Sequence, residues 1–188
     1  PLLKILNIKE ICSEANFRKI PVVVDNTFCT AVIQKPLELG ATLSLISTTK
    51  FINGHSDALG GAVITNDESW NNKMIFSQKS LGLNPSPFDC WLITRGLKTL
   101  PLRIAQQTEN AHFIANELNS HKLIDQLIYP FNKNHPQFEL AKSQMKIGGS
   151  MITLKLKLNK NDTFDFCKKL KYFTLAESLG GVESLICH

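Results

Sequence analysis

The sequence lacks the features that mark several classes of protein. It contains no uninterrupted apolar run long enough to cross a bilayer, so we expect no membrane span. It also contains no internal repeat and no low-complexity segment, which argues against repeat architectures and disordered tracts. Hydrophobic residues make up 43% and charged residues 20% of its 188 residues, an ordinary globular composition. A chain of this length can form one domain, or one domain and part of a second.

Cysteines are few, and their spacing excludes two kinds of site. Their number is odd, they lie far apart, and no CxxC pair occurs. The five cysteines are Cys12, Cys29, Cys90, Cys167 and Cys187. This pattern argues against a disulfide framework and against a structural zinc site, so we expect no metal. Reduced thiols are typical of cytoplasmic proteins, and the sequence therefore predicts a cytoplasmic protein.

The net charge of +5 does not by itself indicate a nucleic-acid partner. The Lys and Arg residues are scattered, with one modest cluster at Lys168, Lys169 and Lys171. No aromatic residues alternate with them as a base-stacking surface requires. We interpret the charge as a solvated surface and expect no nucleic-acid binding.

Apolar spacing over the first 65 residues indicates alternating helices and strands. Helical spacing occurs over 4–18 and 35–39, the latter before Gly40, where a helix can end. Continuous β-branched and apolar runs predict buried strands at 20–24, 42–46 and 61–65. This order is typical of an α/β layer with a mainly parallel sheet.

The pattern changes after Pro87. Residues 88–118 contain few helix breakers, Gly96 and Pro101, and predict one long helix or two kinked ones. A small α+β piece is expected beyond it, with strands at 124–129, 151–158 and 173–175 and helices at 138–144 and 163–170.

Two predicted strand ends carry polar side chains suited to one kind of chemistry. Asp25 follows the first strand, and Ser47-Thr48-Thr49-Lys50 follows the next. Strand ends of an α/β layer can meet at one crevice. A pyridoxal phosphate (PLP) site needs a lysine for the aldehyde, an acid for the ring nitrogen and hydroxyls for the phosphate. From this pattern alone, Asp25 could also be an ordinary turn residue and Lys50 a solvated surface lysine.

Longer motifs favour the PLP site over these alternatives. VVVDNTF, PLELGA, STTKFINGHSDALGG, PSPFDCWLITRGLKTLPLR, HPQFELAKSQM and FTLAESLGGVESLI occur in this order through the chain. Together they resemble the Cys/Met-metabolism PLP-dependent enzyme family. The resemblance implies a type I, aspartate aminotransferase-like α/β fold. In that fold residues 1–95 belong to the large PLP-binding domain, 96–144 form the connecting helix and linker, and 145–188 begin the small C-terminal α+β domain.

The same resemblance implies roles for individual residues. Lys50 matches the catalytic lysine that binds PLP, Asp25 the partner of the ring nitrogen, and Thr27 the residue beside the ring. The phosphate-binding hydroxyls correspond to Ser47 and Thr49. Substrate-binding positions correspond to Glu177, near the far end of the substrate, and Ser178, near its carboxylate and the lysine.

The LAESLGGVESL segment is similar to cystathionine γ-lyases and γ-synthases. We therefore expect γ-lyase activity, which converts cystathionine to cysteine, 2-oxobutanoate and ammonia. The alternatives are γ-synthase activity, which joins an acyl-homoserine and cysteine, and a non-catalytic fragment of such an enzyme. Family members are homotetramers with shared active sites, so we expect this assembly and a small sulfur amino acid as substrate.

Other expected parts of the family's site have no counterpart within the 188 residues. These are the upstream phosphate loop and ring-stacking tyrosine, and the downstream arginine that binds the substrate carboxylate. The chain therefore resembles roughly half of such an enzyme. Within NGHSD, His55 and Asp57 could form an acid–base pair, but a hydrogen-bonded loop that shapes the site is the favoured interpretation.

Overall fold

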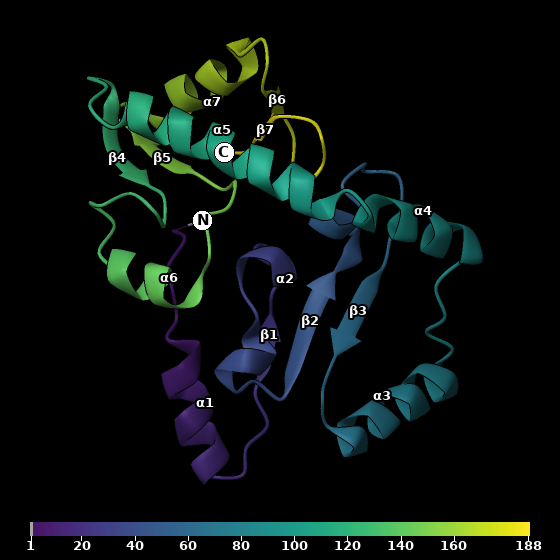
Figure 1. The fold of residues 1–188 in the computed structure, drawn as a ribbon. Coiled ribbons are helices and arrows are strands. Elements are labelled where there is room, and N and C mark those ends of the chain that lie inside the picture. Colours follow the sequence, from purple (N-terminus) through teal and green to yellow (C-terminus); the bar gives the residue numbers. More distant parts are fainter. Residues whose placement is uncertain (1) are drawn as a thin grey trace.

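The computed structural model describes residues 2–188 as a mixed α/β structure (Figure 1). Its three-stranded sheet has the order β1 (Val23–Asp25), β2 (Leu43–Ser47), β3 (Gly61–Ile64). β1 and β2 are parallel, whereas β2 and β3 are antiparallel, with Ser44 opposite Ile64. The expectation of a mainly parallel sheet thus holds for one of the two strand pairs. β2 and β3 are joined by a short turn and a loop, without the long crossover helix that a parallel return needs.

Short helices cover the amino-terminal part of the sheet. α1 (Ile8–Phe17) lies within the predicted 4–18 helix and buries Ile8 and Cys12 against Ala41. A four-residue helix, α2 (Thr30–Ile33), follows β1. The predicted helix before Gly40 is the 3₁₀ helix η1 (Pro36–Leu39). Gly40 ends it with φ of +99°, a left-handed conformation that favours glycine.

The predicted 88–118 helix is two helices. α4 (Pro87–Leu97) and α5 (Leu100–Leu118) are separated at Lys98 and Thr99, and Pro101 lies in the first turn of α5, where proline is tolerated. Figure 1 shows α5 extending from the end of β2 to the second sheet.

The carboxyl-terminal part has the predicted α+β character. β4 (Ile124–Ile128) and β5 (Thr153–Leu156) form an antiparallel pair, and α6 (Phe138–Gln144) lies between them in the chain. α7 (Lys160–Lys169) precedes a short parallel pair, β6 (Thr174–Leu175) and β7 (Leu185–Ile186). β4 comes from the predicted linker and pairs with β5 of the predicted small domain. The boundaries between the expected domains stay a prediction.

One long helix, α3 (Glu68–Leu81), was not predicted. Its sequence carries no clear apolar stripe, in keeping with a helix that buries none of its residues. Its ends do carry helix signals. The Asp67 carboxylate accepts a hydrogen bond from the Trp70 amide, and Gly82 ends the helix with φ of +65°. Capping residues would therefore have identified this helix where periodicity did not.

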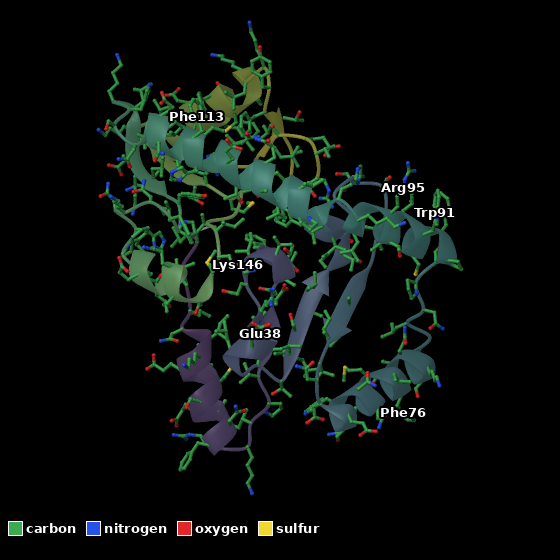
Figure 2. The ribbon with its side chains drawn as sticks, viewed as in Figure 1. Glu38, Phe76, Trp91, Arg95, Phe113 and Lys146 are labelled. Atoms are coloured by element: carbon green, nitrogen blue, oxygen red, sulfur yellow. The ribbon has the colours of Figure 1, made fainter. Side chains whose placement is uncertain are left out.

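The main core connects α5 and α6 to the segment that contains Lys50. It includes Phe51 and Ile52 together with Leu100, Ile104 and Met145. Some large apolar side chains are instead exposed, among them Phe76 on α3 and Trp91 on α4 (Figure 2). Among residues 2–188, no helix combines the length and apolar character needed to cross a membrane.

Candidate functional site

The carboxyl ends of β1 and β2 bring three of the predicted residues together. The register places Asp25 opposite Leu45, and since side chains alternate along a strand, Ser47 lies on the same face as Asp25. The Thr27 hydroxyl accepts a hydrogen bond from the Ser47 amide at 2.9 Å. The Asp25 carboxylate accepts one from the Thr27 amide, also at 2.9 Å. Asp25 is exposed, so its carboxylate is open to a ligand at this sheet edge.

Lys50 lies in a kinked turn, η2 (Thr48–Ile52), that directly follows β2. Lys50 itself has non-helical dihedral angles, φ −88° and ψ −124°. The two residues after it, Phe51 and Ile52, are buried in the core. Lys50 itself is half-buried. The buried side chains of Phe51 and Ile52 anchor its segment in the core.

The carboxyl-terminal segment contacts this turn from another side. Lys50 Nζ donates a hydrogen bond to Ser178 Oγ over 3.3 Å. Gly180, with φ of +82°, lies directly on the peptide group between Lys50 and Phe51, because a Cβ atom there would be 2.5 Å from the Phe51 nitrogen. Glu177 is exposed beside Ser178. The structure thus brings Ser178 to Lys50, as the resemblance implies for these positions.

Thr49 has a local role in the structure. Its hydroxyl donates to the Gly60 carbonyl at 3.3 Å and accepts from the Gly60 amide at 3.0 Å. These bonds tie the lysine turn to the beginning of β3. A hydroxyl oxygen has a second lone pair, so Thr49 retains acceptor capacity besides these bonds.

The NGHSD segment forms a hydrogen-bonded loop around Asn53. Asn53 is buried, and its side-chain amide donates to Asp57 Oδ1 at 2.9 Å. His55 Nδ1 donates to the Asn53 carbonyl at 2.7 Å. Both side chains bind Asn53, in agreement with a loop that shapes the site. The loop and α4 line a hollow of about 330 Å³.

Arg103, for which no role was predicted, contacts the lysine turn from α5. Its guanidinium group donates to the carbonyls of Phe51, at 2.8 Å, and Ile52, at 3.2 Å. Burial lowers the pKa of Arg103 from its ordinary value. Its position in the GLKTLPLR segment could have drawn attention to it, but no spacing rule connects residue 103 with residue 50.

Cys29, near the site in sequence, has the character of an inert thiol. It is half-buried, and this burial raises the pKa of its thiol to about 11. Cys187 is exposed. A thiol that stays protonated at neutral pH is a poor nucleophile, so Cys29 is not a candidate for covalent catalysis.

The chemistry of these side chains fits PLP. That cofactor has an aldehyde, a basic ring nitrogen and a phosphate, which require an amine, a carboxylate and hydrogen-bond donors. Lys50, Asp25 and the hydroxyls of Ser47 and Thr49 supply those groups within one turn and two adjacent strand ends.

Known proteins agree with this assignment of the fold. The curated relatives include the cystathionine γ-synthase of Mycobacterium tuberculosis, 45% identical over 188 residues. They also include the cystathionine γ-lyase of Dictyostelium discoideum and the cystathionine β-lyase of Lactococcus lactis, each 46% identical over 186 residues. These matches cover 99–100% of this chain and 48–49% of the relatives. The chain therefore spans about half the length of the curated relatives it matches.

A solved structure of a related enzyme has the same fold over the whole length of this chain. The cystathionine γ-synthase from Xanthomonas oryzae pv. oryzae, in complex with aminoacrylate and cysteine, matches all of this chain and 49% of its own. The TM-score is 0.97 at 45% sequence identity, which confirms the expected fold class. The profile of the Cys/Met metabolism PLP-dependent enzymes matches residues 1–188. The chain belongs to this family of PLP-dependent enzymes.

Proposed function

We propose that this chain carries the lysine half of a PLP-dependent trans-sulfuration enzyme, with Lys50 as the residue that binds the cofactor. The hydrogen bond from Lys50 to Ser178 is the observation that carries the proposal, because it joins two residues to which the resemblance gives related roles. Bound PLP supplies an electrophilic aldehyde and a ring that takes up electrons from the substrate.

Each residue of the site has a distinct task in this proposal. Asp25 holds the proton on the ring nitrogen, since a carboxylate is the natural acceptor there. Thr27 lies beside the ring and keeps the ends of β1 and β2 together through its bond to Ser47. Ser47 and Thr49 provide hydroxyls for the phosphate.

Lys50 has two tasks. Its Nζ atom would bind the aldehyde of PLP, and as a free amine the same atom would take the proton from the α-carbon of the substrate. Lysine suits this work because its pKa shifts readily with environment. Ser178 holds the free amine through the 3.3 Å hydrogen bond, which keeps it at the site between proton transfers. Glu177 lies next to Ser178, toward the far end of the substrate.

We propose γ-lyase activity first: cystathionine is cleaved at its γ-carbon to cysteine, 2-oxobutanoate and ammonia. The LAESLGGVESL segment and the 46% identity to a cystathionine γ-lyase support it. The second candidate is γ-synthase activity, which the 45% identity to cystathionine γ-synthases supports equally. In either case a small sulfur amino acid is the substrate and a homotetramer the expected assembly.

Two assays on the purified protein distinguish the candidates. The first measures release of 2-oxobutanoate from cystathionine, and the second measures formation of cystathionine from an acyl-homoserine and cysteine. γ-Lyase activity predicts the first reaction, and formation of cystathionine alone contradicts it. If neither reaction occurs and Lys50→Ala changes no property, the chain is a non-catalytic fragment of such an enzyme.

A further inference from the structure

Arg103 uses its guanidinium group to bind carbonyl oxygens instead of an acid. Its Nη1 atom donates to the Phe51 carbonyl at 2.8 Å, and its Nη2 atom donates to the carbonyls of Ile52, at 3.2 Å, and Gly96, at 2.8 Å. Its Nε atom donates to Thr99 Oγ1 at 3.0 Å. None of the ion pairs within residues 2–188 includes Arg103. The guanidinium group has five N–H donors in a fixed planar arrangement, and here they reach three carbonyls and a hydroxyl from two sides of the group.

The surrounding backbone makes room for this guanidinium group. Gly54 has φ of +73°, and a Cβ atom there would collide with Arg103 Nη1. Gly96 is similarly close to the Asn53 carbonyl, so α4 lies directly on the end of the lysine turn. The backbone therefore leaves space shaped for this side chain, and two of the three carbonyls that Arg103 binds belong to the two residues that follow Lys50.

A second side chain of α5 holds the other partner of Lys50. Gln107 lies one helical turn beyond Arg103, on the same face of the helix. Its Nε2 atom donates to the Gly181 carbonyl at 3.0 Å. Gly181 follows Gly180, which packs on the Lys50–Phe51 peptide. Figure 1 shows one end of α5 near the end of β2, with the carboxyl-terminal segment close to the same helix.

We propose that Arg103 is a positioning residue for Lys50: by fixing the carbonyls of Phe51 and Ile52 it sets where the Lys50 amine stands relative to Ser178. Gln107 holds the Ser178 side of the same contact from the same helix. Arg103 does not touch the substrate, and its effect is transmitted through the two peptide groups after Lys50. This inference rests on the proposed function, since it needs Lys50 to be the residue that binds PLP.

The test compares Arg103→Lys and Arg103→Ala with the wild-type protein. Lysine keeps the charge but has its donors on a single nitrogen in place of a planar group, so both variants should misplace the Lys50 amine. Misplacement of a reacting group by about 1 Å costs about a hundredfold in rate. We therefore expect kcat for each PLP-loaded site to fall about a hundredfold. The KM should stay close to the wild-type value, because the residues assigned to the substrate are unchanged.

A second measurement does not depend on turnover. PLP is added to cofactor-free protein, and the reaction with Lys50 is stopped at intervals with borohydride and followed by mass spectrometry. We expect the adduct on Lys50 to form about tenfold more slowly in Arg103→Lys. The matched control is Arg18→Lys, since Arg18 is exposed and its guanidinium group pairs with Glu14, away from the lysine turn. Its rates should equal those of the wild type.

Melting temperature separates positioning from simple support of the fold. Slower adduct formation and lower kcat at each loaded site, with a melting temperature near wild type in Arg103→Lys, support the proposal. Unchanged rates at each loaded site overturn it, as does loss of folded protein in both variants. If the wild-type protein itself forms no adduct on Lys50, the proposed function fails, and that outcome is recognised before any variant is made.

Discussion

Lys50 and Ser178 are 128 positions apart in the sequence, yet the lysine amine donates a hydrogen bond to the serine hydroxyl over 3.3 Å. The contact joins the turn after β2 to the segment between β6 and β7. It is maintained by Gly180, which packs on the Lys50–Phe51 peptide, and by the bond from Gln107 to Gly181. The proposed catalytic lysine is therefore held between the sheet and the carboxyl-terminal segment.

Replacement of Gly180 should weaken this junction. In Gly180→Ala the new methyl group would meet the Phe51 nitrogen and the Lys50 carbonyl carbon, at 2.5 and 2.9 Å, on a backbone that also disfavours alanine. A left-handed conformation costs about 1 kcal/mol, and the overlap should add about 2 kcal/mol. Urea unfolding measures the free energy of unfolding, and the rate of adduct formation on Lys50 should fall with it.

Gly82→Ala is the matched control for that change. Gly82 is also left-handed, with φ of +65°, but a Cβ atom there has nothing within 4 Å. This variant should lose only about 1 kcal/mol of unfolding free energy and keep the wild-type reactivity of Lys50. Equal losses in the two variants would show that the close packing of Gly180 on the lysine turn is unimportant.

Asp25→Asn should reduce turnover while leaving the covalent bond between PLP and Lys50 intact. The amide keeps the shape of the carboxylate but not its charge, so it cannot hold a proton on the ring nitrogen. We expect kcat to fall by at least about a hundredfold, the size typical of a lost electrostatic contact at a reacting centre. Kinetics and borohydride trapping measure the two effects separately.

Asp67→Asn serves as the control for the aspartate variant. Asp67 caps α3 by accepting from the Trp70 amide, and asparagine caps a helix about as well. Its kcat should therefore match the wild type. A normal kcat in Asp25→Asn as well would remove Asp25 from the site.

Tyr129 should make stability depend on pH in the alkaline range. The side chain is fully buried, and its hydroxyl donates to the Gly149 carbonyl at 3.1 Å. Burial raises the pKa of Tyr129 to about 12, whereas tyrosine in an unfolded chain ionises near 10. Its contribution is therefore complete below about pH 10 and is lost as pH rises through the folded value.

The measurement for Tyr129 is the difference between the wild type and Tyr129→Phe. Near pH 8 the variant should be about 1 kcal/mol less stable, because the Gly149 carbonyl loses its buried partner. Between about pH 10 and 12 the difference in unfolding free energy should shrink. A difference that stays constant over that range would mean that the buried phenol does not titrate as its burial implies.

Local sequence predicted most elements of the fold, and long-range packing accounts for what it missed. The strands after residues 20, 42 and 61 and the η1 turn before Gly40 carry strong local signals, and all are present. The antiparallel direction of β3 was not predicted, because it depends on the short connection from β2. α3 was missed because its residues are not buried and form no apolar stripe.

The candidate site divides in the same way. The strand ends identified Asp25 and Lys50 as candidates, and the family resemblance gave them their roles, which stay predictions. Ser178 could be connected with Lys50 only through the family resemblance. Arg103 and Gln107 could not be predicted, since their role depends on carbonyl groups, which every residue has and no sequence pattern marks.

The most direct test of the account is the attachment of PLP to Lys50. The purified protein is incubated with PLP, reduced with borohydride, digested and mapped by mass spectrometry, beside Lys50→Ala treated in the same way. The proposed function predicts one phosphopyridoxyl group, on Lys50 in the wild type, and none at the corresponding peptide in the variant. A wild-type protein without an adduct, or with an adduct on another lysine, would contradict it.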